Sequence, residues 1–406
     1  MTDLAAILAS LILLAPLQDA PTAPTPAARE VVADEAQKAD EAWKGAWTDF
    51  AFEVASAIPN EIHGRDRAKA QQAVVSALVA RGALLRASQL APAIRGWRQG
   101  EALAEIALAY AKAGKPDEAR SLLKQALALV PGLLDWQRER VQVMAGRVYV
   151  WLDDQDEATK LEKGVGESEM GKVPAARAAR FPAEHFDAQM AGLDDWIKTR
   201  NFDLVRNSVD VALEFYPACL RDGARRARVE ALVAAANEQL AFDLRIANLL
   251  RMAEIVRAAG ETDAARSFVA KADSVLANAQ WVPEDSVLQR ARVARAKARA
   301  GEREQALSDL EAALAQFDAS REQIVDIFRA QPLRAVAEAY AELGERDRAR
   351  AVYMRAIEEG SRNPNARPRA EDLSATALSL VTSGVEPGEA LAARLRSVRA
   401  GLAEPW

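Results

Sequence analysis

One spacing of small, aromatic and glycine residues recurs along this 406-residue chain. Residues 103–131 contain the pattern in full, at the positions Ala107, Tyr110, Gly114, Ala119, Ala126 and Pro131. The same intervals separate Ala337, Tyr340, Gly344, Ala349 and Ala356. Less complete copies contain the pairs Gly260 with Ala265 and Gly301 with Ala306. Such a repeat constrains the fold strongly, because each copy must pack against its neighbours to bury its apolar residues.

The spacing predicts two antiparallel helices in every copy. Small residues such as Ala107 and Ala119 allow two helices to cross closely. The glycine of each copy, such as Gly114, can adopt the left-handed conformation that ends a first helix. The chain is rich in Ala, Leu, Glu and Arg, which favour helix, and the strict alternation typical of strands is scarce. The sequence therefore predicts an all-α fold, an α-solenoid of antiparallel helical hairpins.

These motifs resemble the tetratricopeptide repeat family. In that family the first helix of each hairpin lines a concave groove that captures extended or helical peptides. The resemblance therefore implies a superhelix that binds a protein or peptide partner. The later copies depart from the family pattern, because Gly301 follows Gly260 by 41 residues and Gly344 follows Gly301 by 43. A family repeat is about 34 residues long, so we expect longer helices or longer connections in this part of the chain.

The pattern divides the chain into five predicted parts. They are a signal peptide with a Pro-rich linker (1–28), an N-terminal capping helix (29–62), a first set of repeats (65–163), an irregular loop (164–186), and further repeats with a C-terminal cap (187–406). A cap is expected because the outer face of a terminal repeat would otherwise meet water. The loop is predicted because Gly and Pro residues interrupt the helical pattern.

The N-terminal segment predicts export. Residues 4–17 form a nearly continuous apolar run, too short for a bilayer, which needs about 20 apolar residues. Its length fits the hydrophobic region of a signal peptide, and a Pro-rich segment follows it. Asp3 precedes the run without any Lys or Arg, and no clear cleavage site follows. We expect an exported protein of the periplasm or envelope without a stable membrane span, with a cytoplasmic protein as the alternative.

No catalytic residue, metal site or cofactor is predicted. Residues 166–172 (GESEMGK) match the start of a phosphate-binding loop, but Val173 replaces the Ser or Thr that would hold magnesium. The two histidines, His63 and His185, lie in no metal-binding motif. The single cysteine, Cys219, is expected to be a small apolar residue. The sequence therefore predicts a protein that is not an enzyme.

One predicted helix, residues 287–300, is strongly basic. It carries Arg290, Arg292, Arg295, Lys297 and Arg299 without any acid. Helical geometry places Arg292, Arg295 and Arg299 on the side opposite the other two cations. This helix could bind anions or nucleic acid, or it could pair with acids of the next helix such as Asp309. The net charge of −6 and the mixed signs along the chain do not favour a nucleic-acid partner.

Three arginines are candidates for binding a partner. Arg257, Arg295 and Arg334 lie three, six and ten residues before the glycines that end their helices, and these offsets share one helix face. In the family that the chain resembles, basic residues in the groove often clamp an acidic terminus, which implies this role for the three arginines. The predicted function is a non-catalytic scaffold or adaptor for a protein or peptide of unknown identity. A purely structural helical spacer is the alternative.

Overall fold

The computed structural model describes residues 26–406, which divide at Trp43 into two units, Met1–Trp43 and Lys44–Trp406. In the first unit, residues 26–43 form the first part of helix α1 (Pro26–Ala57). The predicted signal peptide and linker lie outside the described residues, apart from residues 26–28. Within the described residues, no helix is both long enough and apolar enough to cross a bilayer.

The second unit consists of helices, and residues 26–406 contain no β-strand. After α1, its helices form nine pairs. The pairs are α2 (Asn60–Ala80) with α3 (Leu84–Leu90), α4 (Trp97–Lys112) with α5 (Pro116–Ala128), α6 (Asp135–Trp151) with α7 (Gln155–Glu162), α8 (Lys172–Arg180) with α9 (Pro182–Lys198), α10 (Phe202–Cys219) with α11 (Gly223–Asn237), α12 (Phe242–Ala258) with α13 (Thr262–Asn278), α14 (Pro283–Arg299) with α15 (Arg303–Ser320), α16 (Ala330–Glu342) with α17 (Arg346–Gly360), and α18 (Ala366–Thr382) with α19 (Gly388–Ala400). Four short 3-10 turns lie between pairs: η1 (Ala91–Ala93), η2 (Val130–Gly132), η3 (Arg321–Gln323) and η4 (Asp326–Phe328). The chain is therefore an all-α solenoid.

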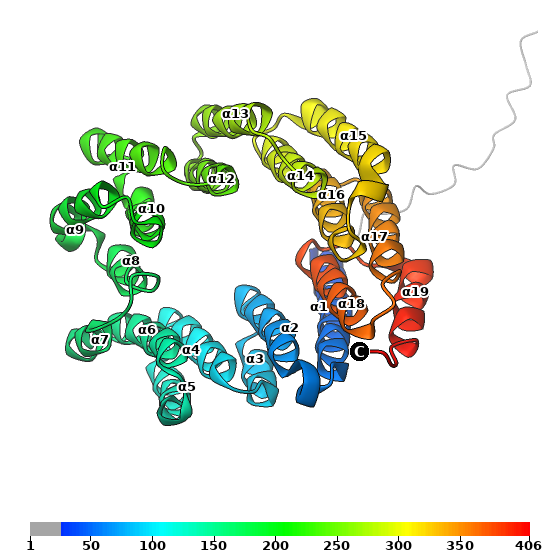
Figure 1. The fold of residues 1–406 in the computed structure, drawn as a ribbon, viewed down its shortest axis with the longest axis horizontal. Helices are drawn as coiled ribbons and strands as arrows, with labels where there is room; N and C mark the ends of the chain where they lie inside the picture. The colour runs from blue at the N-terminus through cyan, green and yellow to red at the C-terminus, as the bar shows by residue number, and fades with distance from the viewer. Residues whose placement is uncertain (1–25) are drawn as a thin grey trace, which may run out of the picture. The chain divides into compact units, whose positions relative to one another are not determined.

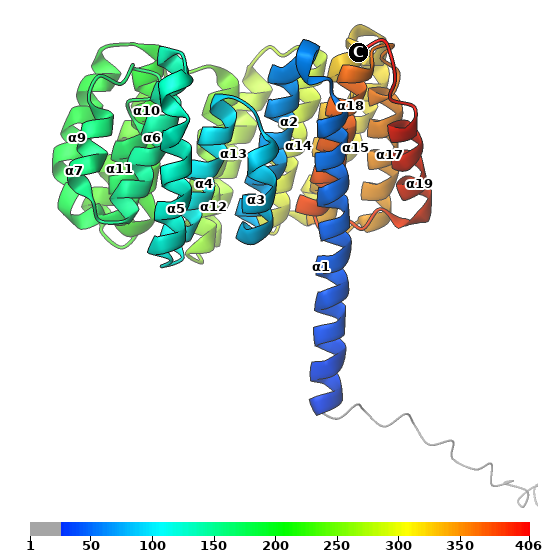
Figure 2. The same ribbon diagram turned by 90° about the horizontal axis from the view of Figure 1, so that it is seen from below.

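The helices of Lys44–Trp406 form two layers around a ring. The even-numbered helices α2 to α18 lie on the inside and the odd-numbered helices α3 to α19 on the outside (Figure 1). Each inner helix contacts the next inner helix, and α18 contacts α2. Figure 2 shows the helices of this unit side by side, with their axes roughly along one direction. Because an outer helix returns the chain after each inner helix, all inner helices run the same way and begin at one rim.

The ring closes at a seam where α2 contacts α18 and residues 44–57 of α1 pack against both helices. The hydroxyl of Ser374 on α18 donates a hydrogen bond of 2.9 Å to the carbonyl of Ala51, across 323 residues of sequence. On the opposite flank, the side chain of Gln71 on α2 donates to Ser56 Oγ at 2.9 Å. Ala51 is fully buried. This segment therefore contacts both the first and the last hairpins and reinforces the closure between them.

The repeat residues pack where two helices cross. Ala107, Ala119 and Ala126 are fully buried in the α4–α5 hairpin, and Ala337, Ala349 and Ala356 are fully buried in the α16–α17 hairpin. The glycines that end the first helices have positive φ: +72° at Gly114, +86° at Gly260, +84° at Gly301 and +76° at Gly344. A side chain is strained at such φ values, so glycine reverses the chain here at the lowest cost.

Two predicted segments differ from the structure. The predicted loop over 164–186 is wrong for residues 172–186, because α8 forms at 172–180 and α9 begins at Pro182. Burial of Val173 and Ala178 stabilises α8, and a proline in the first turn of α9 loses no hydrogen bond. The capping helix predicted over 29–62 corresponds to α1, which ends earlier, at Ala57, because Pro59 has extended backbone before α2.

Gly171 should be intolerant of a side chain. A Cβ at this position would lie 2.6 Å from the Cβ of Asn207, whose amide donates to the carbonyl of Glu167 at 2.7 Å. We expect Gly171→Ala to lower the free energy of unfolding by about 1–3 kcal/mol through overpacking. Chemical denaturation measures the change. The control is Gly192→Ala on α9, where a Cβ meets nothing within 4 Å and alanine favours helix. Equal stability of the two variants would contradict this account.

Candidate functional site

The three predicted partner-binding arginines lie on successive inner helices. Arg257 is on α12, Arg295 on α14 and Arg334 on α16. Arg257 and Arg295 line a pocket of about 190 Å³ between α12 and α14. Arg295 and Arg334 line a second pocket of about 310 Å³ between α14 and α16. The structure therefore places the three side chains along one continuous stretch of inner helices.

Each of these arginines already pairs with a carboxylate. Arg257 Nη2 lies 2.6 Å from Glu254 Oε1 on the same helix, and this hydrogen bond lowers the pKa of Glu254. Arg334 Nη1 lies 2.8 Å from Asp372 Oδ1 on α18. Burial raises the pKa of the Asp372 carboxyl, and the charge of Arg334 opposes this effect. A partner carboxylate would have to displace these internal pairs to reach either guanidinium.

Arg295 belongs to a network across three inner helices. It lies 3.0 Å from Glu338 and 3.2 Å from Glu342, both on α16. Arg299 lies 2.8 Å from Glu342 and 3.6 Å from Glu254 on α12. Burial opposes ionisation of Glu342, but the hydrogen bonds and charges of the two arginines outweigh it and lower the pKa. The network holds α12, α14 and α16 together.

The other side of the basic helix α14 is buried. The side chain of Lys297 is 7% exposed, and its Nζ lies 2.8 Å from Asp273 on α13 and 2.7 Å from Asp309 on α15. Burial opposes the charge on Lys297, but hydrogen bonds to the two carboxylates raise its pKa. This ammonium therefore ties α14 to the outer layer and is not available to a partner.

Arg292 is an exposed cation of α14 that stays available. It is exposed, and no hydrogen bond or ion pair to it occurs within residues 26–406. It lines both the α12–α14 pocket and the α14–α16 pocket. From the sequence, Arg292 was predicted to belong to the basic helix face that could bind anions or nucleic acid, and not to the three groove arginines. Its face on the helix was predictable, whereas its lack of a partner depends on the neighbouring helices.

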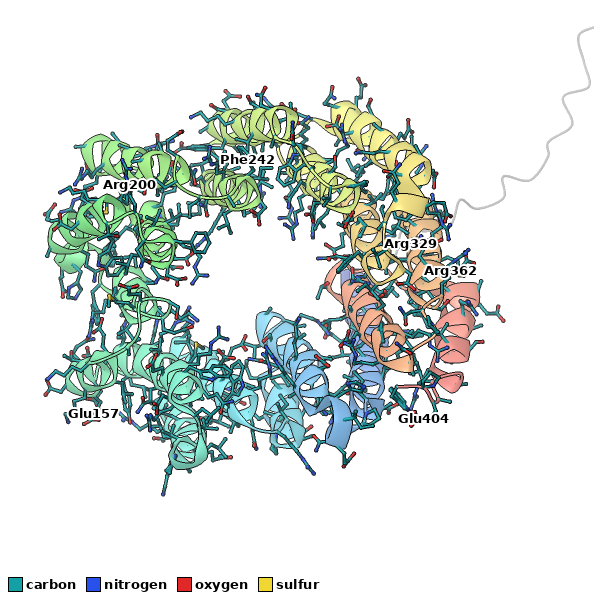
Figure 3. All side chains as sticks on the ribbon, in the orientation of Figure 1. Glu157, Arg200, Phe242, Arg329, Arg362 and Glu404 are labelled. Atoms are coloured by element: carbon teal, nitrogen blue, oxygen red, sulfur yellow. The ribbon has the colours of Figure 1, made fainter. Side chains whose placement is uncertain are left out.

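Exposed apolar side chains occur at or just before the start of many inner helices. Six of them, each at a different inner helix, are Ile62 (69% exposed), Trp136 (49%), Phe202 (51%), Phe242 (46%), Val282 (54%) and Phe328 (45%). We call these six residues the apolar rim, because the inner helices begin at one rim of the ring. Figure 3 labels Phe242 among the side chains of this unit. A bulky exposed apolar residue at the start of six of the nine first helices was a repeat signal that the sequence interpretation missed.

Residues 166–172, which match the start of a phosphate-binding loop, form contacts within the protein. Lys172 Nζ lies 2.8 Å from Glu169 Oε2, and Glu169 is buried. The backbone N–H of Gly166 donates to Glu139 at 3.3 Å. Val173 is buried in α8. The charged groups of this segment therefore serve the packing of residues 163–171 against their neighbours.

The two histidines lie on different helices and do not form a common site. His63 interrupts the helical geometry of α2, and its Nδ1 lies 3.8 Å from Asp66. The His185 ring lies edge-on to Phe181 near the start of α9. Among the side chains that the structure describes, no group of three or more is placed to bind a metal. Cys219 is buried, and burial raises the pKa of its thiol.

Comparisons with known proteins identify the class of repeat. Tetratricopeptide repeat models match residues 100–133, which contain most of α4 and all of α5, and residues 335–359 in α16 and α17. No curated protein matches this chain in sequence. Among solved structures, the chain is similar to a "circular tandem repeat protein with novel repeat topology and enhanced subunit contact surfaces", at 14% identity and a TM-score of 0.26, over 90% of this chain and 96% of that one.

The chain is a helical repeat protein that contains tetratricopeptide repeats, which confirms the resemblance found in the sequence. Repeats of this kind generally mediate protein–protein interaction, and proteins built from them are typically non-catalytic scaffolds.

Proposed function

We propose that this protein is a non-catalytic scaffold that binds a protein or peptide partner at the inner face and apolar rim of its helical ring. The apolar rim carries the proposal. Exposed apolar surface costs free energy in water, and large patches of it mark interaction sites. A spacer with no partner would have no use for an aromatic or aliphatic side chain at the start of six elements along one rim.

The inner face supplies polar groups for the same partner. Arg292 is free to pair with a carboxylate, and the cavities on both sides of it can accept side chains. The carboxylates of Glu254, Glu338 and Glu342 interrupt the positive field of the neighbouring arginines. This mixture favours a protein partner over nucleic acid, whose phosphates require an uninterrupted basic surface. We include export to the periplasm or envelope in the proposal, on the basis of the apolar run at residues 4–17.

Site-specific photocrosslinking tests this function. A photoreactive phenylalanine analogue replaces Phe242 or Phe328 on the rim, or Leu85, a 71% exposed apolar residue on the outer helix α3. After irradiation in cells, we expect one shared protein adduct at the two rim positions and none at Leu85. Adducts at all three positions would mean unspecific contact. The absence of adducts at both rim positions would favour the structural spacer.

A further inference from the structure

A third pocket, of about 370 Å³, lies where α2, α4 and α6 begin. Its lining includes Arg65 from α2, Arg95 from the turn before α4, Trp97 and Arg98 from α4, and Trp136 from α6. We call it the Arg–Trp pocket. Three arginines line it, and no carboxylate does. It lies apart from the pockets around α14, and none of the predicted groove arginines lines it.

The arginines of this pocket have unsatisfied donors. Arg65 and Arg95 are exposed, and neither forms a side-chain hydrogen bond or ion pair within residues 26–406. Arg98 donates one hydrogen bond of 2.6 Å to the side-chain oxygen of Gln72, while its buried Nε–H has no acceptor. A buried donor without an acceptor is costly, so an incoming anion would be stabilised here.

The charges around Arg98 also favour an anion. Burial lowers the pKa of its guanidinium. The negative charges of Glu101 and Asp66 oppose this shift, while the positive charges of Arg140 and Arg65 lower the pKa further. An anion between these guanidinium groups would relieve their mutual repulsion. Arginine is the side chain best suited to hold a carboxylate by two parallel hydrogen bonds.

The two tryptophans give the pocket an apolar wall. Their rings are 5.4 Å apart in an edge-on arrangement. The guanidinium of Arg98 lies 4.4 Å from the ring centre of Trp97, and that of Arg140 lies 5.1 Å from it, so cations already occupy Trp97. Trp136 is 49% exposed. Its ring can therefore contact an aromatic side chain of a ligand that also bears the anion.

We propose that the Arg–Trp pocket binds an acidic segment of a protein partner, in which carboxylates flank an aromatic side chain. This inference rests on the proposed scaffold function and names the chemistry of one anchor. A nucleic acid fits less well, because Glu61 and Asp135 directly adjoin the pocket residues Asn60 and Trp136 in sequence and would repel a continuous phosphate backbone. A short acidic peptide has only a few carboxylates, and all of them can lie at the arginines of the pocket.

The test uses the full chain and fluorescein-labelled peptides blocked at both ends. The probe is Gly-Glu-Phe-Glu-Gly, compared with Gly-Gln-Phe-Gln-Gly and Gly-Glu-Ala-Glu-Gly. Fluorescence polarisation should show that the probe binds roughly 10-fold more tightly than either comparison peptide, because each lacks one of the two contacts. The Arg65→Gln/Arg95→Gln variant should weaken probe binding by roughly 10-fold or more. Trp136→Ala should remove the preference for Phe over Ala.

A matched variant controls for overall charge. Arg120→Gln/Arg346→Gln removes two exposed arginines from the outer helices α5 and α17, where neither forms a side-chain ion pair within residues 26–406. It should bind the probe as wild type does. Equal weakening in both double variants, or equal binding of the Glu and Gln peptides, would overturn the proposal. Displacement of the probe by AMP at lower concentrations than by unlabelled peptide would also overturn it and assign the pocket to nucleotides.

Different experimental results would contradict the proposed scaffold function and the proposed chemistry of the Arg–Trp pocket. Phe242 and Phe328 lie on α12 and next to α16, and neither lines the Arg–Trp pocket. Rim crosslinks together with no peptide binding would overturn the pocket chemistry alone. Peptide binding without crosslinks at Phe242 and Phe328 would support the pocket and would contradict this part of the apolar rim as the partner's docking surface.

Discussion

Arg334→Met should lower the free energy of unfolding by about 3–5 kcal/mol at neutral pH, because it leaves a buried carboxylate without its cation. The side chains of Arg334 and Asp372 are each 14% exposed and lie 2.8 Å apart. The Cβ and carboxyl of Asp372 lie against Gly360, so this carboxylate has little room to move towards water. Chemical denaturation at pH 7 measures the loss.

The size of this loss should depend on pH. Burial raises the pKa of Asp372 above its ordinary value of 3.8, so its protonated form is favoured in the folded state. Stability from such a group is fully present below the ordinary pKa and is lost as pH rises through the folded pKa. Removing Arg334 should raise the folded pKa further. The deficit of Arg334→Met should therefore be small near pH 4 and should grow towards pH 7.

Two further variants separate charge pairing from other effects. Adding Asp372→Asn to Arg334→Met removes the buried charge and should recover most of the stability at pH 7. Arg292→Met removes an exposed arginine without an ion pair and should change stability by no more than about 0.5 kcal/mol. Loss of partner adducts in Arg334→Met with unchanged stability would contradict the structural role and restore Arg334 as a partner-binding residue.

Ala51→Asp should open the ring. Ala51 is fully buried in the seam, and its carbonyl accepts the hydrogen bond from Ser374. A buried carboxylate without a partner costs about 3 kcal/mol or more, and separating the seam exposes it to water. The remaining hairpin interfaces do not depend on the seam, since each repeat is stabilised by its own neighbours. We therefore expect an open solenoid and not an unfolded chain.

Small-angle scattering and hydrogen exchange measure this outcome. The radius of gyration should increase, and exchange should accelerate in α1, α2 and α18 while α10 and α12 stay protected. Ala46→Asp places the same charge on an exposed residue of α1 and should leave the ring closed. Global unfolding of Ala51→Asp would show that closure stabilises every hairpin, and unchanged scattering would show that the seam tolerates a charge.

Ala51→Asp and Arg334→Met also test the proposed function. Opening the ring would change the curvature along which the apolar rim and the inner pockets are arranged. If one partner contacts Phe242 and Phe328 together, its binding should weaken in Ala51→Asp. The same partner should bind Arg334→Met normally at a temperature where that variant is folded, because Arg334 pairs with Asp372 and not with the partner.

The existence and the position of a helical hairpin could be predicted from a short stretch of the sequence. Ala107, Gly114 and Ala119 lie within one short window, and the contacts that they make in α4 and α5 are local. Helix-ending glycines and small crossing residues act over a few turns, so their spacing predicts each hairpin without knowledge of the rest. The shared helix face of Arg295 and Arg299 was predictable for the same reason, since helical periodicity alone sets it.

The contacts that the side chains of each hairpin make with other hairpins depend on the tertiary structure. Arg334 pairs with Asp372, 38 residues further along, whereas Arg65 forms no ion pair with any carboxylate that the structure describes. Helical periodicity does not distinguish these two cases. Helix α8 forms despite its Gly and Pro neighbours because α6 and α10 bury it. Ring closure depends on contacts between residues that are far apart in the sequence. The rotations between successive hairpins add up around the ring, and only their sum brings Ser374 to Ala51.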